Sequence, residues 1–290
     1  MIIVGGTATN GIDERLAKIT KSKLVKVVHK VFPDGESYVR VPEPLTGEEV
    51  AVVQTTQPPQ NKNLVELLLV LEALKDTGAT KITAVVPYLA YSRQDRRFLD
   101  GEAISVKTVL NLIYAAGAST LVVVEPHHPE SLSYFPGEAR VVDPIPALGR
   151  ELRGRVNSPF VLAPDRGAVD RAERLARELG CGYTYLEKER DRITGEIRVR
   201  GISIGSLKGR DVILVDDIVS TGGTLVEASK VAYSLGAEGV YAAAVHLLMV
   251  KDTLTRLKEA GVRDLVGVNT VVPQDNVKLV DVSDLIALKL

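Results

Sequence analysis

Short apolar runs of strand length alternate with amphipathic stretches of helix length along the chain. Alternation of this kind is typical of βαβ units, in which parallel strands are buried in a sheet and helices cover its faces. The pattern therefore predicts an α/β fold with mainly parallel sheets. The expected strands are residues 2–4, 50–53, 82–86, 121–124, 160–162, 212–215, 240–245 and 265–268, and the expected helices include residues 64–75, 104–116, 169–179, 225–235 and 253–260.

The length of the chain predicts two such domains. A single domain most often holds about 100–150 residues, and this chain has 290. A cluster of Pro and Gly between residues 144 and 154 marks the expected boundary. We expect an N-terminal domain over residues 1–146 and a C-terminal domain over residues 147–290. The last ~10 residues are expected to pack on the N-terminal domain.

An internal similarity bears on how the two domains arose. Residues 106–127 align without a gap on residues 225–246, so that Gly117 meets Gly236 and His127 meets His246. Tandem duplication of one α/β domain would explain this match. Any two helix–strand units share such a pattern of apolar residues and terminal glycines, and that explanation is equally open.

Charge and composition disfavour several functional classes. Lys and Arg number 36 and Asp and Glu 37, whereas a general nucleic-acid binder has a basic excess. The single cysteine, Cys181, excludes an intramolecular disulfide and a multi-cysteine zinc site. The first residues do not form a signal peptide, and no apolar run reaches the ~18–20 residues that span a bilayer. We therefore expect a soluble, cytoplasmic protein with neither nucleic acid nor membrane as a partner.

The strongest local signal is the string DDIVSTGGT, which follows an apolar strand. Parallel sheets place ligands at the carboxyl ends of their strands, where Asp216 and Asp217 stand. Glycines and hydroxyls before a helix form a cradle for phosphate, and carboxylates suit sugar hydroxyls. We therefore expect a sugar phosphate here, although a strand–turn–helix with capping side chains is the simpler alternative. The cradle would comprise Ser220, Thr221, Gly222, Gly223 and Thr224.

This string resembles the ribose-phosphate motif of the type I phosphoribosyltransferases. The further segments FPDGE (32–36), VPYLAYSRQD (86–95), APDRG (163–167) and EKER (187–190) resemble the ribose-phosphate diphosphokinase family, also called phosphoribosyl pyrophosphate synthetases. The resemblance extends over nearly the whole chain. It implies two tandem phosphoribosyltransferase-like domains and a homo-oligomer. The implied reaction transfers the β,γ-diphosphoryl group of ATP to the 1-hydroxyl of ribose 5-phosphate, with Mg²⁺ as cofactor, and serves nucleotide, His and Trp biosynthesis.

The resemblance assigns the following residues to ATP binding: Phe32, Asp34, Glu36, Arg93, Gln94 and His127. Phe32 can stack on adenine, and the two carboxylates after it can accept hydrogen bonds from the amino edge of the base. Arg93 offers permanently charged, bidentate recognition of phosphate and is also expected to act in catalysis. In the family the adenine loop comes from a neighbouring subunit, which implies at least a dimer.

The remaining implied residues surround the diphosphoryl group. Asp165, Arg166 and Gly167 form the diphosphate loop, and Asp165 together with His127 is expected to bind the metal. Lys188 and Arg190 lie in a charged stretch shaped like a hairpin arm, which the family uses as a catalytic flap. A charged stretch is otherwise usually a solvated surface.

Two other functions remain open at this point. A nucleobase phosphoribosyltransferase would use the DDIVSTGGT string in the opposite metabolic direction, but it would not explain residues 32–36 or Arg93 and Gln94. A catalytically inactive regulatory homologue is the second alternative. Such proteins usually lose residues of the flap or of the ribose-phosphate string, whereas this chain keeps both.

Overall fold

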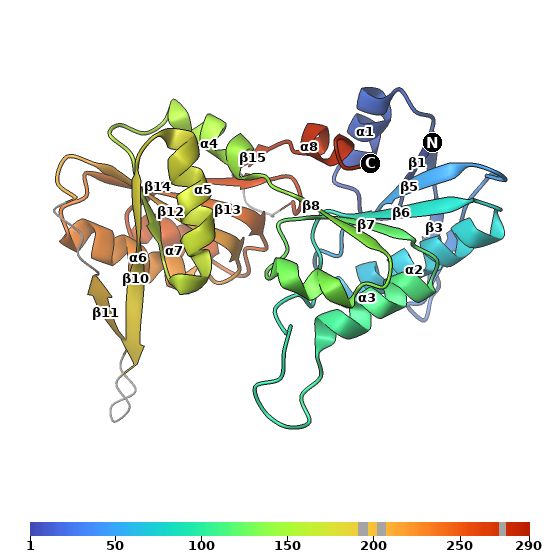
Figure 1. The fold of residues 1–290 in the computed structure, drawn as a ribbon, viewed down its shortest axis with the longest axis horizontal. Coiled ribbons are helices and arrows are strands. Elements are labelled where there is room, and N and C mark those ends of the chain that lie inside the picture. The colour runs from blue at the N-terminus through green and yellow to red at the C-terminus, as the bar shows by residue number, and fades with distance from the viewer. Residues whose placement is uncertain (191–196, 202–206, 273–276) are drawn as a thin grey trace. The chain divides into compact units, whose positions relative to one another are not determined.

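Two compact units make up the protein. The computed structural model describes residues 1–190, 197–201, 207–272 and 277–290, and for residues 188–190 and 197–201 it gives the backbone alone. We call Met1–Asp143 together with Asp281–Leu290 unit 1, and Pro144–Val280 unit 2. Each unit contains a central sheet flanked by helices (Figure 1), which confirms the predicted α/β class.

Unit 1 is built on a six-stranded sheet with the order β2-β1-β5-β6-β7-β8, in which all pairings are parallel. One face of the sheet carries α1 and α8, and the other carries α2 and α3 (Figure 1). The strands are β1 (Ile2–Gly5), β2 (Leu24–Lys26), β5 (Glu49–Val53), β6 (Lys81–Val86), β7 (Thr120–Val124) and β8 (Glu138–Val142). The helices are α1 (Ile12–Thr20), α2 (Gln60–Asp76), α3 (Ser105–Ala115), the short η1 (Pro129–Tyr134) and α8 (Ser283–Ala287).

A separate antiparallel hairpin completes unit 1. Its strands are β3 (Val28–Val31) and β4 (Ser37–Arg40), and β4 lies against α2. The sequence analysis did not predict this hairpin, because most of its residues are exposed or half-buried and form no apolar run.

Unit 2 has a seven-stranded sheet with the order β11-β10-β9-β12-β13-β14-β15. Only the β10–β11 pairing in this sheet is antiparallel. The strands are β9 (Phe160–Ala163), β10 (Gly182–Arg190), β11 (Ile197–Gly201), β12 (Asp211–Val219), β13 (Gly239–Leu247), β14 (Val262–Val268) and β15 (Lys278–Val280). The helices are α4 (Ile145–Arg153), the short η2 (Arg166–Ala168), α5 (Val169–Leu179), α6 (Gly223–Ser234) and α7 (Thr253–Glu259).

The two sheets share one topology. The order β2-β1-β5-β6-β7-β8 of unit 1 matches the order β10-β9-β12-β13-β14-β15 of unit 2, strand for strand. The gapless alignment of residues 106–127 on 225–246 does not pair the strands that occupy equivalent places in the two sheets. It pairs α3 and β7 with α6 and β13, although β7 occupies the place of β14. That alignment is therefore displaced by one helix–strand unit, and the general αβ pattern explains it.

The chain returns to unit 1 after β15. In this C-terminal segment α8 packs on α1, and Ile286 is fully buried. The guanidinium of Arg140 in β8 donates hydrogen bonds to the carbonyl oxygens of Lys289 and Leu290 at 2.7 and 2.8 Å. Unit 1 is thus assembled from two stretches of the chain that are separated by the whole of unit 2.

Candidate active site

Asp216 and Asp217 lie inside β12 and not after it. The prediction that this strand ends at residue 215 is wrong, because β12 continues to Val219. Its pairing with β9 stops at Leu214, whereas its pairing with β13 continues to Val219. The last residues of β12 therefore extend past the carboxyl end of β9. Side chains there face the loop that follows β9, which is where ligands of parallel sheets bind.

The two carboxylates have different surroundings. Asp217 is buried, and its Oδ2 lies 3.6 Å from Nη2 of Arg171, which is also buried. Arg171 is on α5, and its Nη1 donates a hydrogen bond of 3.0 Å to the carbonyl oxygen of Gly167. The sequence analysis missed Arg171. Arg171 connects Asp217 to the diphosphate loop and gives Asp217 a permanently charged cation as a neighbour.

Asp216 is left beside other negative charges. Burial raises its pKa well above the ordinary value, and the charges of Asp217 and Asp165 raise the pKa further. The backbone N–H of Asp217 donates to Asp216 Oδ1 at 2.9 Å, which opposes the shift only in part. A ligand that offers hydroxyl donors or a cation would relieve this repulsion. The environment of Asp216 therefore favours a ligand with hydroxyl donors or a positive charge.

Residues 220–224 form the turn into α6. Two carbonyl groups of this turn point toward α7, since Ser220 accepts a hydrogen bond from Thr253 Oγ1 at 2.8 Å and Thr221 accepts one from Arg256 Nη1 at 2.9 Å. Gly222 has a φ of 72°, and a Cβ atom there would lie 3.0 Å from Thr253 Cγ2, so glycine is required.

The start of α6 is open to an anion. No side chain caps this helix in the described part of the chain, so its first N–H groups can bind phosphate oxygens. Thr221 is exposed, and Gly223 and Thr224 are half-buried. The turn therefore leads into an uncapped helix start, and its role as a phosphate cradle stays a prediction.

The loop after β9 contains the next three candidate residues. Asp165 accepts a hydrogen bond from the N–H of Gly167 at 2.9 Å through Oδ1 and thereby caps η2. Arg166 is exposed and forms an ion pair with Glu187 of β10, with Nη2 and Oε1 2.8 Å apart. The loop thus connects the carboxylates of β12 with the first residues of the β10–β11 arm.

The backbone of residues 186–190 and 197–201 forms the predicted hairpin arm. β10 pairs with β9 only over residues 182–185, and from Leu186 onward it pairs with β11. In Figure 1 the two strands extend away from the rest of unit 2. Lys188 and Arg190 belong to β10, but their side chains lie outside the part of the chain that the structure describes.

In unit 1 the predicted adenine loop forms the tip of the β3–β4 hairpin. Phe32, Asp34 and Glu36 are all exposed. Gly35 has a φ of 98°, which lets the turn close with a hydrogen bond of 2.8 Å from the N–H of Phe32 to the carbonyl oxygen of Glu36. The Phe32 ring lies edge-on to Tyr38 at 6.2 Å. An exposed aromatic ring with carboxylates beside it is suited to a nucleobase.

Arg93 and Gln94 lie in the long loop between β6 and α3. Arg93 is exposed and able to reach a ligand. The Gln94 amide donates hydrogen bonds to the carbonyl oxygen of Arg96 at 3.0 Å and to Glu102 Oε2 at 3.3 Å. Glu102 also accepts hydrogen bonds from backbone N–H groups of the loop. Gln94 therefore stabilises the loop that presents Arg93.

His127 follows the carboxyl end of β7, as predicted. It is half-buried, and its ring lies 4.5 Å from that of His128 with an interplanar angle of 59°. His127 belongs to unit 1, whereas Asp165, the other expected metal ligand, belongs to unit 2. Among the described residues, no three His, Cys, Asp or Glu side chains form a cluster that could hold a metal ion.

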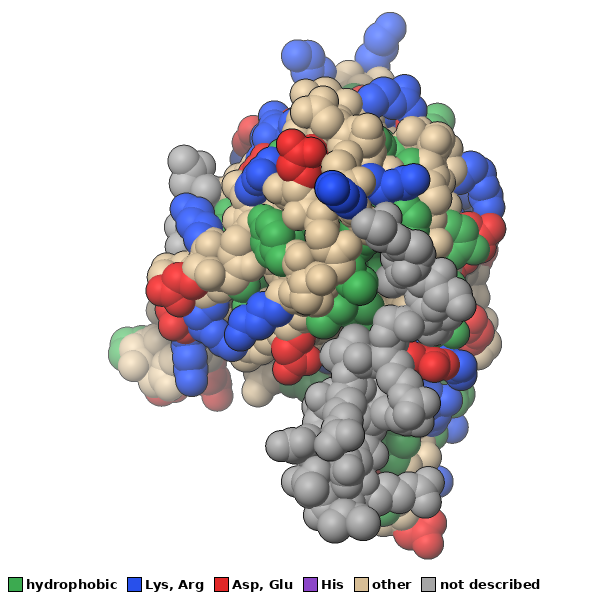
Figure 2. All heavy atoms as spheres, turned by 90° about the vertical axis from the view of Figure 1, so that its left-hand side faces the viewer, with side chains coloured by type: hydrophobic (Ala, Val, Ile, Leu, Met, Phe, Trp, Pro, Cys, Tyr) green, Lys and Arg blue, Asp and Glu red, His purple; other side chains and the backbone are tan. Residues whose placement is uncertain are grey.

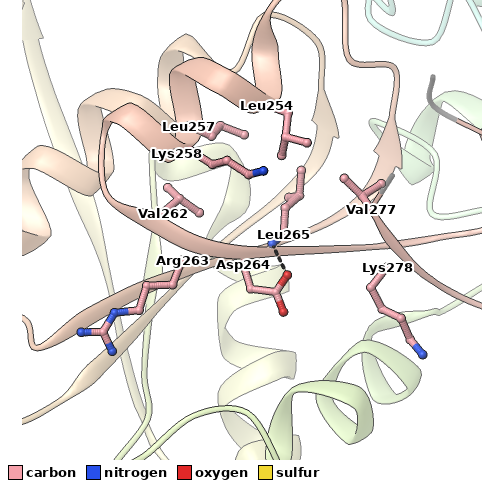
Figure 3. A pocket seen from close by; sticks show the side chains of 9 residues that line it. All are labelled: Leu254, Leu257, Lys258, Val262, Arg263, Asp264, Leu265, Val277 and Lys278. Atoms are coloured by element: carbon pink, nitrogen blue, oxygen red, sulfur yellow. Dashed lines mark hydrogen bonds between the residues drawn. The ribbon is translucent and has the colours of Figure 1, made fainter. Parts of the chain in front are cut away.

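Two hollows in the described part of unit 2 lie away from the residues named above. One of about 230 Å³ lies between α7 and β14 in unit 2 and is lined in part by Leu257, Leu265 and Asp264 (Figure 3). Asp264 already forms an ion pair with Arg155 at 2.6 Å. Another hollow lies at the amino ends of β9 and β12. Neither contains a residue that the sequence analysis selected.

One face of unit 2 and the helices show two further features. On the face of unit 2 seen in Figure 2, Lys and Arg side chains are interspersed with Asp and Glu. Over the described ranges, no helix combines the length and the apolar composition needed to cross a membrane.

The chain is similar to known proteins over its full length. Residues 1–117 match the N-terminal domain of ribose phosphate pyrophosphokinase, and residues 147–284 match the phosphoribosyl transferase domain. The chain is 60% identical to the ribose-phosphate pyrophosphokinase of Sulfolobus acidocaldarius and 57% identical to that of Saccharolobus solfataricus, in each case with 100% of both chains covered.

A solved structure gives the same result. The crystal structure of phosphoribosylpyrophosphate synthetase from Mycobacterium smegmatis superposes with a TM-score of 0.87 at 29% identity, covering 99% of this chain and 96% of that chain. Family profiles, full-length relatives and fold therefore agree with the motifs at the strand ends. The chain belongs to the ribose-phosphate pyrophosphokinase family.

Proposed function

We propose that this chain transfers the β,γ-diphosphoryl group of ATP to the 1-hydroxyl of ribose 5-phosphate. The hydroxyl oxygen attacks the β-phosphorus and loses its proton, and AMP leaves with the bridging oxygen. One observation carries the proposal. At the end of β12, the carboxylate of Asp216 lies beside other negative charges and would be stabilised by a hydroxyl donor or a cation. The start of α6, which is open to phosphate, follows it directly. The relatives that match the full chain at 56–60% identity carry the pyrophosphokinase name, which disfavours both alternatives.

Ribose 5-phosphate fits the end of β12. Its 5-phosphate would bind the N–H groups and hydroxyls of residues 220–224. Its ring hydroxyls would donate hydrogen bonds to Asp216 and Asp217. Because Arg171 already balances Asp217, Asp216 gains more from a hydroxyl donor and is the main determinant of sugar binding.

The residues assigned to ATP would contact its adenine ring and its phosphates. Phe32 stacks on the adenine ring, and Asp34 and Glu36 accept hydrogen bonds from its amino edge. Arg93 and Gln94 would bind phosphate oxygens, and the Gln94 amide also donates hydrogen bonds within the loop around them. Lys188 and Arg190 would neutralise the diphosphoryl group during transfer, so catalysis depends on positioning and charge and needs no covalent intermediate.

The carboxylate of Asp165 fits Mg²⁺, whereas the ring nitrogen of His127 would suit it through a bound water. Oxygen ligands are those that Mg²⁺ prefers, and the negative charge around Asp165 and Asp216 would attract a cation. Asp165 and His127 are the proposed ligands, directly or through water. When bound, the ion would neutralise charge on the phosphate oxygens. We propose a cytoplasmic location as well, because the reaction consumes ATP.

The product of the reaction tests the proposal. The protein is incubated with Mg²⁺, ATP and ribose 5-phosphate, and the nucleotides are separated by ion-exchange chromatography. We expect AMP in equal amount to 5-phosphoribosyl 1-diphosphate. ADP as the nucleotide product would indicate ordinary monophosphoryl transfer and contradict the proposal. Incubation with 5-phosphoribosyl 1-diphosphate and a nucleobase, in place of ATP and ribose 5-phosphate, controls for phosphoribosyltransferase activity.

Replacing Phe32 with alanine should raise the KM for ATP and leave the KM for ribose 5-phosphate unchanged. Stacking on a base contributes about 1–3 kcal/mol, which corresponds to a change of about 5- to 150-fold. Steady-state kinetics with each substrate varied in turn measures both constants. Tyr183, which has the same 41% exposure as Phe32, provides a matched control as Tyr183→Ala. An unchanged KM for ATP in Phe32→Ala would refute the stacking role.

The proposed sharing of the adenine site between subunits has its own test. Phe32→Ala and Asp216→Asn would each damage one half of a shared site, so hybrid oligomers would contain some sites with both halves intact. We expect a mixture of the two variants, exchanged by mild dissociation, to regain activity that neither variant has alone. If the exchanged mixture remained as inactive as its components, each site would be built within one chain.

A further inference from the structure

A buried carboxylate in unit 1 holds the base of the proposed adenine loop. Glu66 lies in the middle of α2, and its side chain is 0% exposed. Its Oε1 lies 2.9 Å from Nε2 of His29 on β3 and accepts a hydrogen bond of 2.6 Å from Oγ of Ser37 on β4. The other oxygen accepts a hydrogen bond from Thr7, in the loop after β1. One carboxylate therefore connects both strands of the hairpin to the sheet.

The hairpin register explains how both strands reach the same oxygen. His29 stands opposite Val39, and Val31 stands opposite Ser37. Residues that alternate along a strand share a face, so His29 and Ser37 lie diagonally on the face toward α2. Val39 packs against the core of unit 1 from this face.

The opposite face of the hairpin carries the proposed adenine contact. Lys30 stands opposite Tyr38, and its Nζ lies 4.6 Å from the centre of the Tyr38 ring and 5.1 Å from that of Phe32. The anchored residues are also close to the tip in sequence. Ser37 directly follows Glu36, and His29 is three residues before Phe32. A rigid anchor at this point fixes the position of the whole loop.

The anchor is a charged group and not a neutral one. Burial would raise the pKa of Glu66, but the hydrogen bonds from Ser37 and Thr7 and the charges of Lys62 and His29 lower it below the ordinary value. Lys62, one turn earlier on α2, places its Nζ 3.4 Å from Oε1. Hydrogen bonds to an ionised acceptor are shorter and stronger than those between neutral groups. The connection is therefore strong enough to order an exposed loop.

We propose that Glu66 is a positioning residue for ATP, acting through His29 and Ser37 on the loop that contains Phe32. This inference rests on the proposed function, because it takes residues 32–36 to be the adenine-binding loop. Glu66 does not contact the reacting atoms. Its part is to order the hairpin before ATP arrives, so that the binding energy of the base is not consumed in ordering the loop.

Glu66→Gln should therefore raise the KM for ATP by about tenfold, with kcat and the KM for ribose 5-phosphate changed by less than about twofold. The loop must be ordered equally in the ground state and in the transition state, and this is why the effect falls on KM. Glu72→Gln is the matched control, since Glu72 lies on the same helix with a side chain that is 68% exposed. We expect it to behave as the unchanged protein.

A fluorescence measurement follows the loop directly. The chain contains no tryptophan, so Phe32→Trp introduces a single probe at the hairpin tip. Adding Glu66→Gln to this variant should lower the anisotropy of the probe without ATP, because the tip becomes free to move. If Glu66→Gln does not fold, Ser37→Ala removes one bond of the anchor and is measured in the same two ways.

The outcomes separate this inference from the proposed function. An unchanged KM for ATP and an unchanged anisotropy in a folded Glu66 variant would overturn the inference, and so would an equal rise in both KM values. If Phe32→Ala leaves the KM for ATP unchanged, the proposed adenine loop itself fails. If Phe32→Ala raises the KM for ATP strongly and Glu66→Gln does not, only the positioning role of Glu66 is contradicted.

Discussion

Replacing Lys188 or Arg190 with alanine should lower kcat by at least about a hundredfold, the usual loss when one preorganised charge contact is removed. Both KM values should remain nearly unchanged, because these cations would meet the diphosphoryl group mainly in the transition state. Their backbone lies in the part of β10 that has left β9 and pairs with β11 alone. Arg190→Lys should regain only part of the rate, since a point charge does not replace a bidentate group.

Arg177→Ala provides the control for this experiment. Arg177 is on α5 in the same unit, with a side chain that is 72% exposed and paired with Glu173 one turn away. Removal of a surface charge of this kind changes stability by less than about 0.5 kcal/mol. Thermal melts beside steady-state kinetics show whether each variant is folded. Near-normal kcat in both alanine variants would contradict the catalytic role of the arm and indicate that it is a solvated surface feature.

Asp216→Asn should weaken ribose 5-phosphate binding and stabilise the protein at the same time. Loss of a charge-assisted hydrogen bond costs about 1.5–3 kcal/mol of binding free energy, or about 10- to 150-fold in Kd. ATP binding should change little. Stability should rise because the substitution removes repulsion with Asp217 and Asp165. Calorimetric titration with each ligand and a thermal melt measure the two effects.

The pH dependence of this stabilisation has a definite sign. The folded pKa of Asp216 is raised, so above its ordinary value of 3.8 the unfolded chain ionises more readily than the folded one. The unfolding free energy of the unchanged protein therefore falls with rising pH over that window. The Asp216→Asn variant lacks this carboxylate, so its unfolding free energy does not fall for this reason. We expect the Tm difference between the two proteins to grow as pH rises above 3.8. A difference that is constant with pH would contradict the assigned repulsion.

Asp217→Asn is the contrasting variant. Asp217 and Arg171 form a buried ion pair with side chains 5% and 7% exposed. Removing one partner leaves the other charge buried and uncompensated, which costs about 3–5 kcal/mol. Neighbouring substitutions should thus shift Tm in opposite directions. If both variants lost sugar binding with the same change in Tm, the two carboxylates would have one common role.

The sequence predicts the buried strands of this fold better than its edges. The expected strand at 82–86 corresponds to β6 (Lys81–Val86), in which every residue but the first is buried. The edge strands β2, β8 and β15 were missed because they are partly exposed and present no long apolar run. The position of the ribose-phosphate turn was predictable because consecutive glycines and hydroxyl side chains mark the turn between an apolar strand and a helix.

Arg171 and Glu66 could not be found from motifs, because each acts through tertiary contacts. Both nevertheless stand at positions that the helical period of the sequence assigns to the buried face of their helix. Arg171 shares the buried face of α5 with Ala172 and Leu175, and Glu66 shares the buried face of α2 with Val70. A charged residue at a core position of an amphipathic helix requires a buried partner. Such residues are therefore worth selecting even where no motif surrounds them.

The two-part construction of unit 1 has a consequence for synthesis on the ribosome. Domains generally fold as units while the chain is made, with the N-terminal one first. Here the first 143 residues emerge without Asp281–Leu290, which the structure groups with the same unit. The face of α1 that α8 covers stays uncovered, and Arg140 lacks its carbonyl partners, until all of unit 2 has been translated. Vectorial folding would therefore complete the second unit before the first.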